Sequence, residues 1–161
     1  MIKTIIKTKS LTLRQLTMED TKMYFALLEK NRQHLSQFGT MTEAKYKTEQ
    51  DVAQSIMKPQ NPKKIRLGVW KNKTLIGLVS LIPRGNHRCE VGGWIGLEFT
   101  RKGYASKAIH RLATYAQKTL GYSRVIGTTH PDNLASQCML KKSGFVPVRK
   151  LKRKHYFIFN T

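Results

Sequence analysis

Residues 90–108 have the composition of a strand, a turn of small residues and the start of an amphipathic helix. In such a unit the first backbone N–H groups of the helix lack an intrahelical acceptor and point toward whatever occupies the turn. The helix dipole adds partial positive charge at the same place. The segment therefore predicts an anion site, most naturally for a phosphate, in which Gly103 and Ala105 keep the backbone accessible.

Two common phosphate signatures are absent from this turn: the Gly-Lys-Ser/Thr ending of a P-loop and the three spaced glycines of a dinucleotide fingerprint. Instead, Glu-x-Gly-x-Trp-Ile from Glu90 and Lys-Gly-Tyr-Ala-Ser-Lys-Ala from Lys102 resemble motif A of the GNAT N-acetyltransferases, in particular the RimJ/RimL type that acetylates protein N-termini. In that family the loop holds the pyrophosphate of acetyl-CoA. The resemblance implies acetyl-CoA as co-substrate, bound by Arg101, Lys102, Gly103, Tyr104, Ala105 and Ser106.

A second motif, Asn-Leu-Ala-Ser from Asn133 with Gly-Phe from Gly144, resembles motif B of the same family. The resemblance implies that Asn133 contacts the pantetheine arm of the coenzyme or the adjoining backbone. Many members carry a Tyr four residues before the Gly of this motif, which protonates the departing thiolate, but Leu140 stands there. In the N-terminal branch a Ser takes that role, which makes Ser136 the implied proton donor.

The resemblance also assigns roles in the preceding strand. Glu90 matches the family's acidic position and is the candidate base, taking the amine proton directly or through a water. A backbone N–H near Ile95 would hold the oxyanion, and Ile95 and Leu97 would pair with the pantetheine arm as an extra strand does. A protein α-amine with a pKa near 7.7 to 8.0 is partly neutral at physiological pH, whereas neutralising a Lys amine costs roughly 4 kcal/mol. An α-amine acceptor therefore needs only modest help.

Several candidates have a structural alternative. Glu90 is alternatively a strand-end residue paired with a neighbouring Lys, and Ser136 is alternatively a simple helix cap. His130 lies either near the sulfur or in an exposed turn. Cys89 and Cys138 show no Cys-x-x-Cys pattern and no metal-ligand spacing, so they are interpreted as apolar fillers and no metal site is expected. Cys89, next to Glu90, is alternatively a reactive thiol.

Hydrophobic patterning predicts the elements that must position these residues. The expected strands are 11–16, 65–70, 74–82, 89–97, 123–129, 146–149 and 155–159, and the expected helices are 17–30, 31–39, 48–58, 103–120 and 133–142. The strand-helix-strand unit around residues 103–120 implies parallel pairing of its two strands. Order and resemblance together predict an α/β GNAT fold in a single domain, residues 1–161. Its mixed, mostly antiparallel sheet would have six to seven strands, with a splayed fourth and fifth strand and flanking helices.

The 161-residue chain is 40% hydrophobic and 24% charged, as expected of one globular domain. It has no 18-residue apolar run, so we expect a cytoplasmic protein without membrane contact, monomeric or homodimeric. The net charge of +21 is unusual: beyond residue 98 the only acidic side chain is Asp132, against thirteen Lys and Arg residues from Arg101 to Lys154. Such a surface favours RNA, a ribosomal surface or an acidic peptide as partner, or is simply solvated.

Three functions remain open from the sequence. The first is acetyl transfer to a primary amine, most favourably a protein N-terminal α-amine of ribosomal-protein type, by direct attack on the thioester. The second is acetylation of the aminoacyl group of charged tRNA, for which the basic segment 149–154 would suit the acceptor. The third is a non-catalytic RNA- or ribosome-binding module that keeps the fold.

Overall fold

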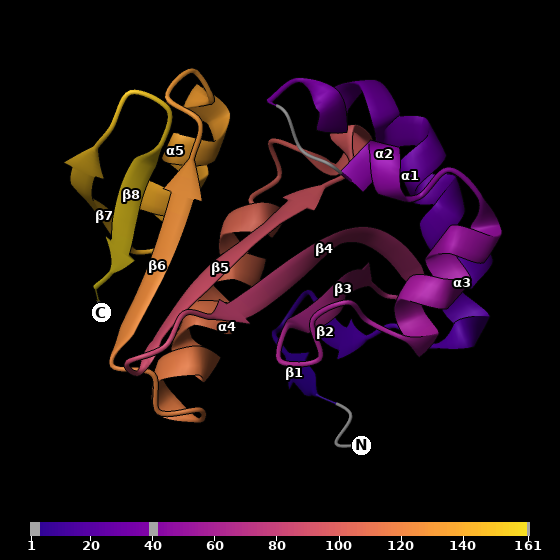
Figure 1. Cartoon of the computed structure of the whole chain (residues 1–161), viewed down its shortest axis with the longest axis horizontal. Coiled ribbons are helices and arrows are strands. Elements are labelled where there is room, and N and C mark those ends of the chain that lie inside the picture. The colour runs from indigo at the N-terminus through magenta and orange to yellow at the C-terminus, as the bar shows by residue number, and fades with distance from the viewer. Residues whose placement is uncertain (1–3, 39–41, 161) are drawn as a thin grey trace.

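The computed structural model describes the backbone of residues 4–38 and 42–160. This part of the chain forms one eight-stranded sheet with the order β1-β2-β3-β4-β5-β6-β8-β7 (Figure 1). Its strands are β1 (Ile5–Lys7), β2 (Thr12–Gln15), β3 (Ile65–Lys71), β4 (Thr74–Pro83), β5 (Arg88–Ile95), β6 (Arg124–Thr129), β7 (Phe145–Lys150) and β8 (His155–Phe159). Neighbouring strands are antiparallel except β5 and β6, which are parallel. The predicted sheet is confirmed, and the short edge strand β1 adds to the strands expected.

Helices cover both faces of the sheet (Figure 1). They are α1 (Thr21–Ser36), α2 (Thr42–Lys45), α3 (Glu49–Met57), α4 (Tyr104–Lys118) and α5 (Leu134–Lys142). The apolar stripe of α4, which includes Ile109 and Leu112, joins one core cluster with Val91 and Ile95 of β5. On the other face α1 and α3 form a second cluster with residues of β3 and β4, and Trp94 packs against it. The two faces of β5 therefore belong to different cores.

Helix α1 is continuous, so the expected division into helices 17–30 and 31–39 is wrong; residue 39 lies outside the described residues. A short 3-10 helix, η1 (Met18–Asp20), precedes it. Asn31, at the expected break, is buried and satisfied within the helix: its Nδ2 donates to the carbonyl of Leu27 at 2.8 Å. Its Oδ1 accepts the N–H of Leu97, 66 residues away. The hydrogen bond that Asn31 accepts from Leu97 thus helps to keep this residue, a weak helix former, inside α1.

A half-buried ion pair joins β2 to the start of α1. The Arg14 guanidinium donates to both carboxylate oxygens of Asp20, at 2.8 and 3.0 Å, and stacks over the Trp70 ring at 4.0 Å. Asp20 also accepts the N–H of Thr17 at 2.7 Å. Burial by itself raises the pKa of Asp20, but these hydrogen bonds and the Arg14 charge outweigh burial and hold that pKa below its ordinary value.

Strands β5 and β6 separate soon after they begin. Only three residue pairs join them, from Arg88 opposite Arg124 to Glu90 opposite Ile126. Beyond that point β5 pairs only with β4, and β6 pairs only with β8. Figure 1 shows the two strands diverging toward their carboxyl ends. These are the fourth and fifth of the expected strands, so their predicted splay is confirmed. It leaves a wedge-shaped gap between β5 and β6 that is closed at Glu90.

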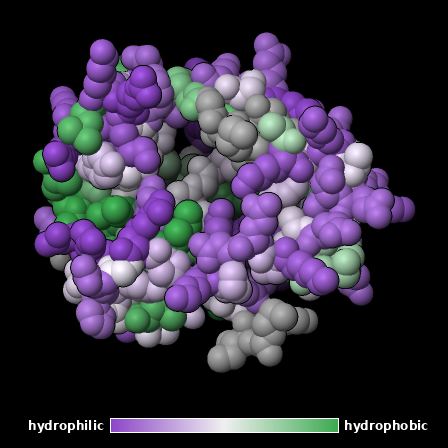
Figure 2. Space-filling view, viewed as in Figure 1, coloured by the Kyte–Doolittle hydropathy of each residue, from purple (hydrophilic) through white to green (hydrophobic). Residues whose placement is uncertain are grey.

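Strand β7 lies at an edge of the sheet and exposes apolar side chains. Val146 is 41% exposed and Val148 is 59% exposed. Figure 2 shows hydrophobic colouring over this side of the molecule, while hydrophilic side chains cover much of the remaining face. Among the described residues, no helix is long and apolar enough to cross a membrane.

Candidate active site

The gap between β5 and β6 is lined by backbone groups of alternate residues. The Arg84 N–H donates to the Arg88 carbonyl and the Gly96 N–H donates to the Ile76 carbonyl, so even-numbered residues of this strand face β4. Hydrogen-bonding direction alternates along an antiparallel strand. The last parallel pair, Glu90 with Ile126, uses the Val91 N–H, so the groups left facing the gap are the Val91 carbonyl and both backbone groups of Gly93 and Ile95. An extended ligand arm in the gap could therefore pair with β5 as another strand does.

Leu97 is not part of this edge, and the predicted strand end at residue 97 is wrong. The residue begins a short 3-10 helix, η2 (Leu97–Phe99), after the strand has ended at Ile95. Its N–H donates to Asn31 Oδ1 at 2.8 Å, and its carbonyl accepts from the N–H and hydroxyl of Thr100. Both backbone groups that were expected to face a pantetheine arm are engaged inside the protein.

The turn before α4 offers open donors. Arg101 and Gly103 both adopt left-handed backbone conformations, with φ of 62° and 77°, and Gly103 is the N-cap residue without a side-chain cap. The N–H groups of Tyr104, Ala105 and Ser106 begin the helix, and no described residue accepts a hydrogen bond from them. Lys102 lies between the two left-handed residues, with Nζ 3.4 Å from the Glu98 carbonyl. The turn has the geometry of an anion site at the mouth of the gap.

Positive side chains surround this helix start. The Lys71 ammonium lies 5.2 Å from the Tyr104 ring centroid, and its hydrogen bond lowers the pKa of that phenol. A cavity of about 420 Å³ adjoins the first turns of α4 and is lined by Thr8, Ser106, Lys107, His110, Arg111 and Lys142. Cations at this end of the helix add to its dipole in attracting an anion.

Glu90 lies where β5 and β6 still pair, and both of its carboxylate oxygens are held. Oε2 accepts from the Arg84 guanidinium at 2.6 and 3.0 Å. Oε1 accepts from the Thr128 hydroxyl on β6 at 2.7 Å, so the side chain spans the closed end of the gap. The alternative salt-bridge interpretation is partly realised, with Arg84 in place of a lysine. The carboxylate is 17% exposed and firmly oriented.

Position along the strand separates Glu90 from Ile95. Five residues of extended chain span about 16 Å. A carbonyl held at the Ile95 N–H would lie beyond direct reach of the Glu90 carboxylate, whereas Gly93 presents an N–H nearer to it. The Ile95 N–H and the Glu90 carboxylate therefore cannot both act directly at one thioester carbon. Either a water relays the proton to Glu90, or an N–H closer to Glu90 holds the oxyanion.

Asn133 and Ser136 meet at the start of α5. The Asn133 Oδ1 accepts the Ser136 N–H at 3.0 Å and thereby caps the helix. The Ser136 hydroxyl is half-buried, and no described residue forms a hydrogen bond with it. Helix α5 follows the carboxyl end of β6, so this hydroxyl lies toward the open end of the gap. No hydrogen bond joins Ser136 to Glu90.

Other polar groups near the end of β6 have defined contacts. The exposed His130 ring accepts the Asp132 N–H at Nδ1 and lies 5.8 Å from the Phe38 ring at the end of α1. The Thr129 hydroxyl is buried, and no hydrogen-bond partner for it is found among the described residues. Burial raises the pKa of the Cys89 thiol to about 12, so it is no reactive nucleophile. No described group of three His, Cys, Asp or Glu residues is placed to hold a metal ion.

The two adjacent glycines of β5 have opposite surroundings. A Cβ at Gly93 would lie 2.3 Å from the Leu78 carbonyl oxygen, so only glycine permits the close approach of β4. A Cβ at Gly92 would meet no heavy atom within 4 Å. Residue 92 shares a side-chain face with Glu90 and Trp94. The sheet is therefore open beside Glu90 on the face that carries α1 and α3.

Sequence reasoning did not find the residues that hold this site in place. Arg84 and Thr128 fix Glu90, and Asn31 engages Leu97. Thr128 lies 38 residues from its partner and Asn31 lies 66 residues from its own, so no local pattern connects them. Arg84 is the exception, because it lies only six residues from Glu90, in the connection between two expected strands.

The site thus combines an unpaired strand edge, an open helix start and a carboxylate held at the closed end of the gap. The sequence matches the Acetyltransferase (GNAT) domain over residues 10–146. The match covers most of the chain, which therefore belongs to this family of acetyltransferases.

Individual relatives agree with this assignment. The chain is 29% identical to the uncharacterized N-acetyltransferase YoaA of Bacillus subtilis (strain 168), over 94% of this chain and 88% of that one. It resembles RimL, a ribosomal L7/L12 α-N-protein acetyltransferase solved with coenzyme A, with a TM-score of 0.83 and 17% identity over 96% and 97% of the chains. The microcin C7 self-immunity acetyltransferase MccE, solved with acetyl-CoA and AMP, has a TM-score of 0.79 and 20% identity, over 94% of this chain and 92% of that one. The two structural likenesses show a shared fold.

Proposed function

We propose that this enzyme transfers the acetyl group of acetyl-CoA to the α-amine at the N-terminus of a protein. The observation that carries the proposal is the pair of open backbone surfaces on either side of the gap: the N–H groups at the start of α4 and the edge of β5 that leads to Glu90. RimL, whose fold the chain shares, acts on such an amine. The modest demand that an α-amine places on a base suits a site with one carboxylate.

The coenzyme fits the donors that the structure presents. The N–H groups at the start of α4 would hold the pyrophosphate, because they are open and lie at the positive end of the helix dipole. The gap-facing groups of Val91, Gly93 and Ile95 would pair with the amides of the pantetheine arm. Lys107, Arg111 and Lys142 supply further positive charge beside the turn. Asn133 contributes by fixing the start of α5.

In the proposed reaction the neutral amine nitrogen attacks the thioester carbonyl carbon. The carbonyl oxygen becomes an oxyanion, held by a gap-facing N–H of β5. The proton lost by the amine passes to Glu90, directly or through water, and from there to solvent. The carbon–sulfur bond breaks, and the thiolate takes a proton from the Ser136 hydroxyl, which is reprotonated by solvent water. The products are an acetylated N-terminus and coenzyme A.

The test begins with isothermal titration of the folded protein with acetyl-CoA, followed by an assay of thiol release. Ser- and Ala-starting peptides would be compared with the same peptides blocked at the α-amine and carrying a free Lys. We expect coenzyme binding and thiol release only with a free α-amine. Acetylation of charged tRNA in place of peptides, or salt-sensitive RNA binding without coenzyme affinity, would overturn the proposal.

A further inference from the structure

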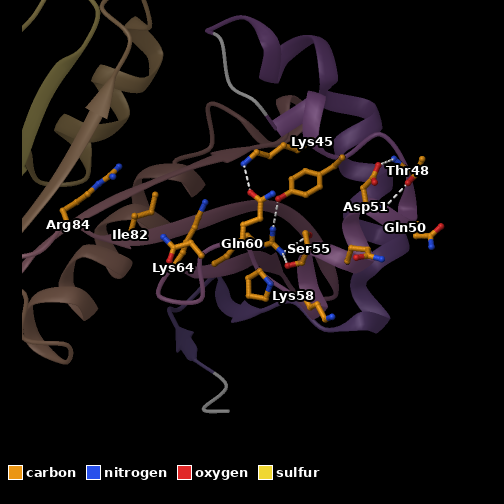
Figure 3. Close-up of a pocket in the computed structure, with 15 residues that line it drawn as sticks. Lys45, Thr48, Gln50, Asp51, Ser55, Lys58, Gln60, Lys64, Ile82 and Arg84 are labelled. Carbon is orange, nitrogen blue, oxygen red and sulfur yellow. Dashed lines mark hydrogen bonds between the residues drawn. The ribbon is translucent and has the colours of Figure 1, made fainter.

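A second cavity, of about 770 Å³, lies outside the coenzyme gap between the segment carrying α2 and α3 and the ends of β3 and β4 (Figure 3). The cations that line it are Lys45, Lys58, Lys64, Arg66 and Arg84. The one carboxylate among its described lining residues is Asp51. That side chain is already engaged at the start of α3, where it accepts the N–H groups of Lys47 and Thr48. The cavity therefore carries a large excess of positive charge.

Arg66 is a half-buried cation whose hydrogen-bond partners among the described residues are neutral. Its guanidinium donates to the Tyr46 hydroxyl at 3.1 Å and to the carbonyl and hydroxyl of Ser55 at 3.3 and 3.2 Å. No described carboxylate forms an ion pair with it. Partly desolvated charges without a counter-charge are costly, so an anion in this cavity would be strongly favoured.

Lys45 and Lys64, at the mouth of the cavity, are also cations without a carboxylate partner among the described residues. Loss of solvent around the Lys64 ammonium, together with the charges of Arg66 and Lys45, lowers the pKa of Lys64. The Lys45 Nζ has only a long contact, 3.5 Å, to the Gln60 side-chain oxygen. Figure 3 shows that this contact crosses the cavity near Lys64. An anion placed among these groups would offset their mutual repulsion.

The cavity reaches the candidate base. Its far end is formed by Ile82 and Arg84. Ile82 is the register partner of Glu90, and Arg84 binds the Glu90 carboxylate. An acceptor whose amine lies beside Glu90 would thus extend directly into the positive cavity.

We propose that this cavity binds the acidic side chains that follow the acceptor's terminal amine, so that the enzyme prefers N-terminal segments rich in Asp and Glu. The inference rests on the proposed function. Side-chain amides also line the cavity and can pair with both N–H and C=O groups of a peptide: Gln50, Gln54, Gln60 and Asn61.

A single-stranded nucleic acid fits the same cavity less well. Such strands are held by aromatic faces on which bases stack. The one aromatic residue among the described lining is Tyr46, whose hydroxyl accepts from Arg66 and whose ring packs toward Tyr24 at 6.0 Å. Carboxylates on a peptide need only the cations and amides that the cavity presents.

The test compares two peptides that differ only in charge, one starting Ser-Asp-Glu-Asp and the other Ser-Asn-Gln-Asn, at fixed ionic strength. We expect kcat/KM at least tenfold higher for the acidic peptide. The double variant Lys45→Gln/Lys64→Gln should lose most of that preference. The matched double variant Lys73→Gln/Lys118→Gln removes the same charge from exposed positions away from the cavity and should keep it.

Calorimetric binding of both peptides in the presence of coenzyme A separates the two proposals. Binding of the acidic peptide that needs Lys45 and Lys64, without acetylation, would support the acidic-peptide site and refute the proposed function. Equal acetylation of both peptides would support the proposed function and overturn the acidic-peptide site. The site also falls if the acidic peptide does not bind, or if the Lys73/Lys118 variant loses the preference equally.

Discussion

Glu90 joins three parts of the molecule: its own strand, Arg84 before it and Thr128 on β6. A carboxylate held in this way has a structural role whether or not it carries a proton during the reaction. Kinetics can distinguish the two roles. Loss of a base lowers the rate of reaction with the amine, whereas loss of an ion pair lowers the stability of the fold. The relevant comparison is between a variant that loses the charge and one that loses only a hydrogen bond.

Replacing Glu90→Gln should lower kcat on an α-amine peptide by about 10²- to 10⁴-fold, the usual contribution of a general base. The deficit should be largest near pH 7 and shrink above pH about 8, where the α-amine is already neutral. Steady-state kinetics from pH 6 to pH 9 measure both effects, and calorimetry should show unchanged acetyl-CoA affinity.

Thr128→Val is the control for Glu90, because it removes one hydrogen bond and keeps the carboxylate with its Arg84 partner. We expect it to lower kcat much less than Glu90→Gln does, because the carboxylate that takes the proton is still present. Equal losses in the two variants would mean that Glu90 acts by holding β5 to β6.

Gly92 and Gly93 give a matched test of the acceptor face. Gly93→Ala should destabilise the protein by about 1 to 3 kcal/mol, because its Cβ would overlap the Leu78 carbonyl. Gly92→Ala should be nearly neutral, since nothing lies within 4 Å. Gly92→Val should fill the space beside Glu90 and raise KM for the peptide while leaving coenzyme affinity intact. Urea unfolding and kinetics check both parts, and an unchanged KM would place the acceptor elsewhere.

At the scale of elements, β2 and α1 depend on the Arg14–Asp20 pair. Asp20→Asn should reduce the free energy of unfolding at pH 7 by about 1.5 to 3 kcal/mol, as for a hydrogen bond to a charged group. Because the folded-state pKa of Asp20 is lowered, the wild-type advantage is complete above the unfolded value of 3.8 and is lost as the pH falls through the folded value.

Urea unfolding of the wild type and Asp20→Asn at pH 7 and pH 3 measures this change in advantage. The exposed neighbour Glu19→Gln is the control and should be within about 0.5 kcal/mol of the wild type at both values. A difference between wild type and Asp20→Asn that grows on acidification would contradict the assignment.

The sequence predicts most elements because each follows a local rule. Period and capping residues mark α3 and α4, and alternation marks β3 and β4. The failures arise where distant contacts outweigh local preference. Asn31 stays in α1 because Leu97 supplies its partner, and β1 and α2 are too short for a periodic pattern. For the site, motifs predict which residues gather near the gap. Register decides that Val91 and Gly93 face it while Leu97 does not.

At the scale of the molecule, β5 and β6 hold two halves of the sheet together over only three residue pairs. A coenzyme arm paired with β5 should raise overall stability by about 2.7 kcal/mol at a concentration one hundred times its Kd. Residue-resolved hydrogen exchange gives a sharper test. Coenzyme should slow exchange at Gly93 and Ile95, whose amides face the gap, more than at Gly92 and Trp94, whose amides already face β4. Equal protection of both sets would exclude strand-like pairing.

The edge strand β7 has a consequence for how this protein behaves at high concentration. Its outer backbone groups and the exposed Val146 and Val148 form a template for association between copies of the chain. Arg149 and Lys150 end the same strand, and three more cations follow in Lys152, Arg153 and Lys154. These cations repel the same edge of another copy and so oppose aggregation through β7. Salt screens this repulsion and should therefore favour association.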